Sequence, residues 1–274
     1  NIVKVGKSSM KNTIFIVLLL LSVGCSKLDS TADTVRKEIV VEGILEAGSN
    51  PQITLSKVLV FGTDEVSNGD LDSLSVFIEN REEVFLLVPD SSLPGSFSNN
   101  NVYVEEGQEY ILRFNYQSYQ IVARTTVPTI PVNVEVTPLA LGIPESVTPG
   151  SQPKTLVTWD NPNNDYHVII IEYLETDYNP INESLNEEEF PKYRVVSTDP
   201  TNANSYNLDT RRHFLFFGKY KLSVMKLNEE YVNFYENIGQ SSLSLSEPIS
   251  NIENGLGVFT AINQIEINVS VYQQ

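Results

Sequence analysis

The side chains that perform most enzyme chemistry are scarce in this sequence. It contains two histidines, His167 and His213, and neither falls in a metal-binding spacing such as His-Glu-x-x-His. The sequence has no Gly-x-Ser-x-Gly nucleophile elbow and no phosphate-binding loop. Gly255-Leu256-Gly257 lacks the third glycine that dinucleotide binding requires. We therefore expect no catalytic residues, no cofactor and no enzyme activity.

One stretch has the spacing of a calcium loop. Asn68, Asp70 and Asp72 place oxygen-bearing side chains at alternate positions, and Glu79 is twelfth from Asn68, as in an EF-hand. However, Ser73 stands at the sixth place, where glycine makes the sharp turn of an EF-hand. A plain turn is the favoured interpretation, and no metal site is expected.

The only cysteine, Cys25, ends an apolar run at residues 14–23 that follows a basic start. These features, with a small-residue junction, are typical of a secretory signal peptide. A membrane-spanning helix needs about 20 apolar residues, roughly twice the length of this run. We expect residues 1–24 to be a signal peptide, with Met10 as the true start and residues 1–9 upstream of it.

The junction Leu-Ser-Val-Gly-Cys at residues 21–25 resembles the lipobox of bacterial lipoproteins, although Leu is commoner than Ser22 at its position. The resemblance implies that signal peptidase II cuts before Cys25 and that the thiol carries diacylglycerol. The alternative is an ordinary secreted protein in which the cysteine has no such role. No other cysteine is available to form a disulfide.

The residues that follow Cys25 are polar and predict a flexible tether up to residue 36. Residues 26–33 partly resemble the export signal of Bacteroidota surface lipoproteins, with Leu28 interrupting the pattern. This resemblance implies an outer-membrane lipoprotein displayed at the cell surface. Removal of residues 1–24 leaves 15 basic and 35 acidic residues, a net charge of −20. Such a charge argues against binding nucleic acid or anionic lipid head groups.

Past the tether, the sequence predicts a mainly β protein with two β-sandwich domains. Alternation in residues 110–116 places Tyr110, Leu112 and Phe114 on one face of a strand, as a half-buried strand requires. Further short β-branched runs lie between Gly, Pro and Asn breaks at residues 37–45, 52–60, 74–79, 82–88 and 119–126. Residues 37–128 are expected to form an N-terminal sandwich of immunoglobulin or transthyretin-like type.

Residues 129–274 are expected to form the second domain. Trp159 on an early strand, an aromatic strand at residues 166–173 and Tyr220 on a late strand look like a fibronectin type III sandwich. That resemblance implies that Trp159 packs in the core and that Tyr220 can form a tyrosine corner. Residues 138–153 are rich in Pro, Gly and Ser and predict a surface loop.

One inserted helix is predicted after Asn228, which can cap it. Tyr231, Phe234, Tyr235 and Ile238 fall at helical spacing and are expected to pack on the sandwich.

The most distinctive stretch is SNIENGLGVF at residues 250–259. Locally, Asn254-Gly255 predicts a turn, Gly257 permits close backbone approach, and the simplest account is a hairpin. The stretch also resembles the C-terminal signature of a Bacteroidota outer-membrane lipoprotein family that carries a domain-of-unknown-function label. The residues that carry this resemblance are Asn251, Asn254, Gly255, Gly257 and Phe259.

Members of that family are commonly encoded beside TonB-dependent outer-membrane transporters. The resemblance therefore implies a non-enzymatic accessory subunit that is anchored to the outer membrane by lipid and docks on a TonB-dependent β-barrel. The first docking regions to expect are the loop at residues 176–191 and the turn at Asn254-Gly255. The alternative is a lipoprotein that binds glycan or another ligand. The sequence argues against glycan binding, because it has a single tryptophan and sugar-binding platforms favour exposed aromatic faces.

Overall fold

The computed structural model describes residues 38–58, 70–145, 152–241 and 250–274. The expected signal peptide, Cys25 and the tether lie outside the described residues, as does Asn68 of the calcium-like loop. None of the helices in the described ranges has the length and apolar character needed to cross a membrane.

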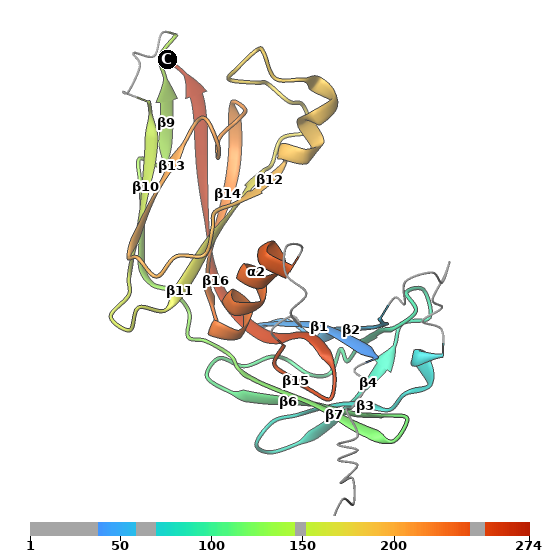
Figure 1. Cartoon of the computed structure of the whole chain (residues 1–274). Coiled ribbons are helices and arrows are strands. Elements are labelled where there is room, and N and C mark those ends of the chain that lie inside the picture. Colours follow the sequence, from blue (N-terminus) through green and yellow to red (C-terminus); the bar gives the residue numbers. More distant parts are fainter. Residues whose placement is uncertain (1–37, 59–69, 146–151, 242–249) are drawn as a thin grey trace, which may run out of the picture. The chain divides into compact units, whose positions relative to one another are not determined.

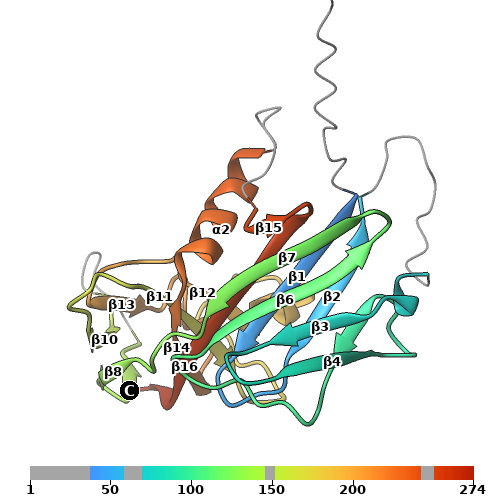
Figure 2. The same cartoon turned by 90° about the horizontal axis from the view of Figure 1, so that it is seen from below.

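The first sandwich is built around the strand predicted from residues 110–116. Tyr110, Leu112 and Phe114 are buried in its core, which confirms the alternation in the sequence. Figure 2 shows one layer of adjacent strands, β7, β6, β3 and β4, lying across β1 and β2. The strands are β1 (Ile39–Glu46), β2 (Gln52–Lys57), β3 (Val76–Glu79), β4 (Val84–Pro89), β5 (Ser96–Ser98), β6 (Glu109–Tyr116) and β7 (Tyr119–Thr126), with a short 3-10 helix η1 (Leu71–Ser73) before β3.

The second sandwich packs a three-stranded sheet, in the order β13-β10-β8, against a sheet that contains β12, β11, β14 and β16 (Figure 1). Strand β9 pairs in parallel with the end of β16, so the segment expected to be a loop at residues 138–153 includes a strand. The bounds are β8 (Val132–Thr137), β9 (Ala140–Ile143), β10 (Lys154–Asp160), β11 (Tyr166–Tyr173), β12 (Val195–Ser197), β13 (Ser205–Asp209), β14 (Gly218–Leu227) and β16 (Leu256–Gln273), with a 3-10 helix η2 (Glu187–Tyr193).

Two aromatic residues confirm the fibronectin type III character of this sandwich. Trp159 on β10 is 3% exposed and packs against the ring of His167 at a centroid distance of 5.1 Å. The Tyr220 hydroxyl donates to the carbonyl oxygen of Phe216 at 2.7 Å and accepts from the Phe216 N–H at 2.9 Å. This pair of bonds is the expected tyrosine corner, and the mainly β, sandwich fold is confirmed with it.

One strand belongs to both cores. The first half of β16 pairs in parallel with β1, from Val40 opposite Leu256 to Glu46 opposite Ile262, and its second half pairs with β14 and β9. Just before it, β15 (Ile252–Glu253) pairs with β7. The domain boundary expected at residue 128 lies between β7 and β8. Residues 252–262 were expected in the second domain, but they pair with β7 and β1 of the first sandwich.

The predicted helix is α2 (Glu229–Ser241), and Tyr231 packs on the sheet as expected. The side chain of Ile238 lies outside the described residues. Val232, 2% exposed, is the most buried described side chain of the helix and packs with Val168 and Leu227, while Tyr235 is 43% exposed. The side chain of Asn228 donates to the carbonyl oxygen of Thr126 at 2.8 Å, which ties the start of the helix to β7.

Candidate functional site

Residues 250–259, which carry the family resemblance, connect the two sheets of the first sandwich, because β15 pairs with β7 and β16 pairs with β1. The Asn251 side chain donates from Nδ2 to the carbonyl oxygen of Phe259 at 2.6 Å and accepts the Phe259 N–H at Oδ1 at 3.0 Å. The Phe259 side chain is fully buried in the first core. One amide thus fixes the backbone of β16 where its aromatic side chain enters the core.

Glycine at residue 257 is required by the closeness of β1. Gly257 has φ +100°, and a Cβ built there would lie 2.1 Å from the carbonyl oxygen of Val41. At Gly255, a Cβ would lie 2.8 Å from the Ile252 side chain and 3.3 Å from the Ile39 carbonyl oxygen. Neither position has room for a side chain, because both lie where β16 meets the start of β1.

Asn254 completes the turn with a left-handed backbone at φ 61°, a conformation that asparagine tolerates better than most residues. Its Nδ2 donates to the carbonyl oxygen of Gln120 on β7 at 2.8 Å. Since Gly255 is buried and Asn254 is half-buried, the turn is not the exposed docking region expected from the sequence. It is also no hairpin, because β15 pairs with β7 and β16 pairs with β1.

The other expected docking region, residues 176–191, packs against the second core through its apolar side chains. Phe190 on η2 is 8% exposed and lies 5.2 Å from the ring of Phe216 and 5.5 Å from the ring of Tyr178. Asn186 caps η2 by accepting the N–H of Glu188 at 3.2 Å. Glu187 and Glu188 of this segment are exposed, but Tyr178 and Phe190 pack in the second core.

Both histidines are buried, and both serve the fold. The N–H of Asp209 donates to Nδ1 of His213 at 3.1 Å, so His213 is neutral there with Nδ1 as acceptor, although the Asp209 carboxylate lies 3.5 Å away. Burial lowers the pKa of His213, and the nearby Asp209 carboxylate only partly opposes that effect. Burial likewise lowers the pKa of His167, whose Nδ1 lies 3.1 Å from the Asp165 carbonyl oxygen.

The carboxylates of the calcium-like stretch have other partners. Asp70 pairs with Lys57 at 2.7 Å, and this pairing holds the pKa of Asp70 below its usual value. Asp72 accepts the N–H of Gly95 at 2.7 Å, and Glu79 pairs with Arg113 at 3.1 Å. Across the described ranges, no group of three or more His, Cys, Asp or Glu side chains could hold a metal ion.

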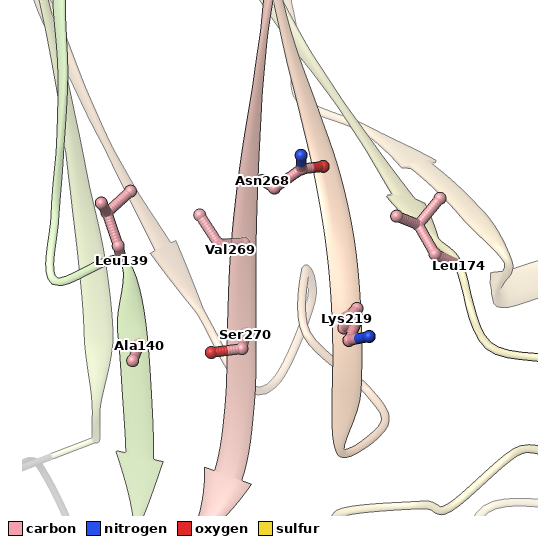
Figure 3. A pocket seen from close by; sticks show the side chains of 7 residues that line it. All are labelled: Leu139, Ala140, Leu174, Lys219, Asn268, Val269 and Ser270. Atoms are coloured by element: carbon pink, nitrogen blue, oxygen red, sulfur yellow. The ribbon is translucent and has the colours of Figure 1, made fainter.

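A shallow pocket of about 460 Å³ lies on the outer surface of the second sandwich, where β9, β14 and β16 come together (Figure 3). Leu139 and Leu174 stand on opposite sides of it, and its polar groups are the Lys219 ammonium, the Asn268 amide and the Ser270 hydroxyl. These groups could form hydrogen bonds to a small ligand. The residues that line the pocket include no carboxylate and no imidazole, so they supply no acid–base pair.

A second pocket, of about 280 Å³, lies beside α2 and is lined almost entirely by apolar side chains. Its walls are Tyr231 and Tyr235 of the helix, Ile44 of β1, and Ile170 and Met225 of the sheet beneath. No expectation from the sequence pointed to this pocket. Its walls come from segments far apart in the chain, and no local pattern signals that they meet.

Comparison with known proteins gives a match to a family whose activity is not defined. A family model described as "Domain of unknown function (DUF4249)" matches residues 26–267. No curated protein matches the sequence. Among solved structures, the chain is similar to "Crystal structure of chicken CNTN1 FN1-FN3 domains", with 14% identity and a TM-score of 0.29, over 86% of this chain and 65% of that chain.

Proposed function

The chain belongs to the DUF4249 family of domains of unknown function, and we propose that it is a non-enzymatic outer-membrane lipoprotein at the cell surface of a member of the Bacteroidota. In this proposal it is an accessory subunit of a TonB-dependent transporter or a similar outer-membrane assembly. The observation that carries the proposal is the apolar run that ends at Cys25, followed by a polar and acidic tether.

The burial, hydrogen bonds and ion pairs of the potentially reactive side chains support a non-enzymatic role. His213 and His167 are buried and neutral, and the Tyr220 hydroxyl is bound to the backbone of Phe216. The carboxylates of Asp70 and Glu79 pair with basic side chains. Each of these groups has a structural partner in place of a catalytic one.

The burial of Trp159 speaks against the glycan-binding alternative. Carbohydrate platforms present aromatic faces to solvent, whereas Trp159 is 3% exposed and packed on His167. The exposed tyrosines Tyr103, Tyr235 and Tyr272 lie on different elements of the chain.

Anchoring supports a role in an assembly. An acyl group at Cys25 would confine the protein to the plane of the membrane, which raises its effective concentration near integral membrane proteins. Weak contacts to a β-barrel are then sufficient for stable association.

Purification from native membranes tests the proposal. The tagged protein, extracted in mild detergent, is expected to bring down a large β-barrel at near-equal stoichiometry, identified by mass spectrometry. If the protein comes down alone and binds a polysaccharide in an affinity gel, the glycan-binding alternative replaces this one.

A further inference from the structure

Strand β4 is apolar on both of its faces. Leu87 is 1% exposed in the first core, while Val84, Leu86 and Val88 point away from that core and are 62%, 49% and 59% exposed. Antiparallel strands with one solvent-exposed face normally alternate apolar and polar residues. Strands that are apolar throughout are normally covered on both faces. We call Val84, Leu86 and Val88 the β4 stripe.

The Val84 end of the stripe lies at a sheet edge where β4 pairs with no strand of the described ranges. β4 pairs with β3 through residues 84–87, but it pairs with β5 only through Val88 and Pro89. On the β5 side, residues 84–87 therefore pair with no strand of the described ranges. Figure 2 shows β4 as the outermost strand of its layer.

The backbone of the stripe faces this open edge. The side chain of Asn99 donates to the carbonyl oxygen of Leu86 at 2.8 Å, and Val88 pairs with β5 on the same side. In an antiparallel ladder, alternate residues direct their backbone groups to the same side, so Val84 faces this edge too. Proteins usually protect such edges with lysine, proline or a bulge, and residues 84–88 contain no lysine and no proline.

We propose that β4 is a docking edge to which an extended segment of a partner protein adds as a further strand. Backbone groups of the segment would pair with Val84 and with the N–H of Leu86, since the Leu86 carbonyl oxygen already accepts from Asn99. Its alternate apolar side chains would cover the stripe. This inference rests on the proposed function, in which the partner is a protein of the outer membrane. It names the surface of the accessory subunit that makes the contact.

Charge defines the chemistry of the partner segment. The exposed residues that flank the stripe are Arg81, Glu82 and Glu83 before it and Asp90 after it, three acids against one base. The chain as a whole carries a net charge of −17. The segment that fits is apolar at alternate positions and has Lys or Arg at both ends.

The same charges exclude a second copy of this chain as the occupant. Antiparallel self-pairing centred on Leu86 would place Glu82 opposite Asp90 of the second copy, twice in each dimer. Like charges directly opposite one another on paired strands are destabilising. Two chains of the same negative charge would also repel each other at long range.

The test uses a double variant, Val84→Lys with Val88→Lys, in the full chain. Both side chains are more than half exposed, so the substitution leaves the core intact, and the melting temperature is the check on folding. The control is Val195→Lys, since Val195 is 53% exposed on β12, a strand at one end of the sheet order and distant from β4 in that order.

Purification from native membranes gives the first readout. The double variant is expected to lose at least nine-tenths of the β-barrel that the wild-type protein brings down, and Val195→Lys is expected to retain it. If wild type brings down no barrel, the proposed function fails. If the double variant retains the barrel, the docking edge is wrong while the proposed function stands.

A synthetic peptide gives a second readout that does not depend on the natural partner. The probe is Lys-Lys-Val-Thr-Val-Thr-Val-Lys-Lys, and its control is the same peptide with alternate backbone nitrogens methylated, which prevents strand pairing. The unmodified peptide is expected to protect the amide hydrogens of Val84 and Leu86 from exchange, with at least tenfold weaker binding to the double variant. Equal binding of the methylated peptide overturns strand addition. A concentration-dependent dimer of wild type that the double variant abolishes overturns the choice of a foreign partner.

Discussion

Asn251 and Phe259 close a ring of two hydrogen bonds, in which one side-chain amide satisfies both the N–H and the carbonyl oxygen of a single backbone residue. The ring lies at the entry of β16 into the first core. Asn251→Ala would leave both Phe259 backbone groups without this partner. We expect it to lower the free energy of unfolding by about 2–4 kcal/mol, measured by chemical denaturation. Asn268→Ala, on the exposed side of the same strand, is the control and should change it by less than about 0.5 kcal/mol.

A comparison of two glycines with positive φ distinguishes the loss of stability caused by backbone conformation from the loss caused by steric crowding. Gly48 has φ +80° and open space within 4 Å of where a Cβ would stand, whereas a Cβ at Gly257 would clash with the Val41 carbonyl. We expect Gly48→Ala to cost about 1–2 kcal/mol, from φ alone. Gly257→Ala should cost at least about 3 kcal/mol or prevent folding. Thermal melts and soluble yield compare the two, and equal losses would refute the crowding argument.

The tyrosine corner predicts a specific loss in Tyr220→Phe. The change removes both bonds to Phe216 and leaves the ring in place, so the free energy of unfolding should fall by about 1–2 kcal/mol. Tyr272→Phe, at a residue that is 46% exposed, should have no measurable effect. Burial also raises the pKa of the Tyr220 phenol, so its absorbance should not titrate with that of the exposed tyrosines until the protein unfolds in alkali.

His213 predicts a loss of stability in mild acid. Its pKa is lowered in the folded state, so between that value and the unfolded pKa of about 6.5 the unfolded chain binds more protons. Stability from this group is complete above about pH 6.5 and is lost as the pH falls. His213→Asn can retain an acceptor for the Asp209 N–H, and it should flatten the fall in melting temperature between pH 7 and pH 5. An unchanged slope would show that other groups control the acid response.

Membrane attachment is predicted to depend on Cys25. Cys25→Ala should release the protein from membranes or stall its processing, because no other residue of the chain can carry the thioether lipid. Fractionation of cells followed by immunoblotting measures this. Membrane association that persists in the variant at full strength would contradict the lipoprotein proposal.

Local patterns predicted the elements of the fold well. Strands β7 and β11 span residues 119–126 and 166–173, as predicted from β-branched and aromatic runs, and β6 spans the alternating residues 110–116. The tyrosine corner followed from the place of Tyr220 on a late strand. These features depend on residues close together in the chain, where sequence periodicity carries the information.

Long-range pairing could not be predicted in the same way. The parallel ladder of β1 with β16 joins Val41 to Gly257, and no turn chemistry connects two such distant residues. Nor did any local pattern show that residues 256–273 form a single strand, β16. In the structure, Gln264 lies within β16, and its side chain bonds to Glu46 of the first sandwich.

The face of α2 that packs on the sheet was predicted only in part. Tyr231 packs there as expected, but Val232, which the aromatic pattern leaves out, is the most buried described side chain of the helix, and Tyr235 is 43% exposed. Asn228, just before the helix, is bound to Thr126 of β7. That contact joins residues 102 apart in the sequence.

The shared strand also governs when the protein can finish folding. Ribosomes make Ile39 long before Phe259, yet both side chains fill the same core, together with Ile252 and Ala261. Until those late residues have been synthesised, the first sandwich has an unfilled interior, and β1 has a neighbouring strand, β2, on one side only. A nascent chain therefore cannot complete its first half ahead of its second. Products truncated before residue 252 would stay open to proteases, so closure of the first core requires that synthesis has passed Ala261.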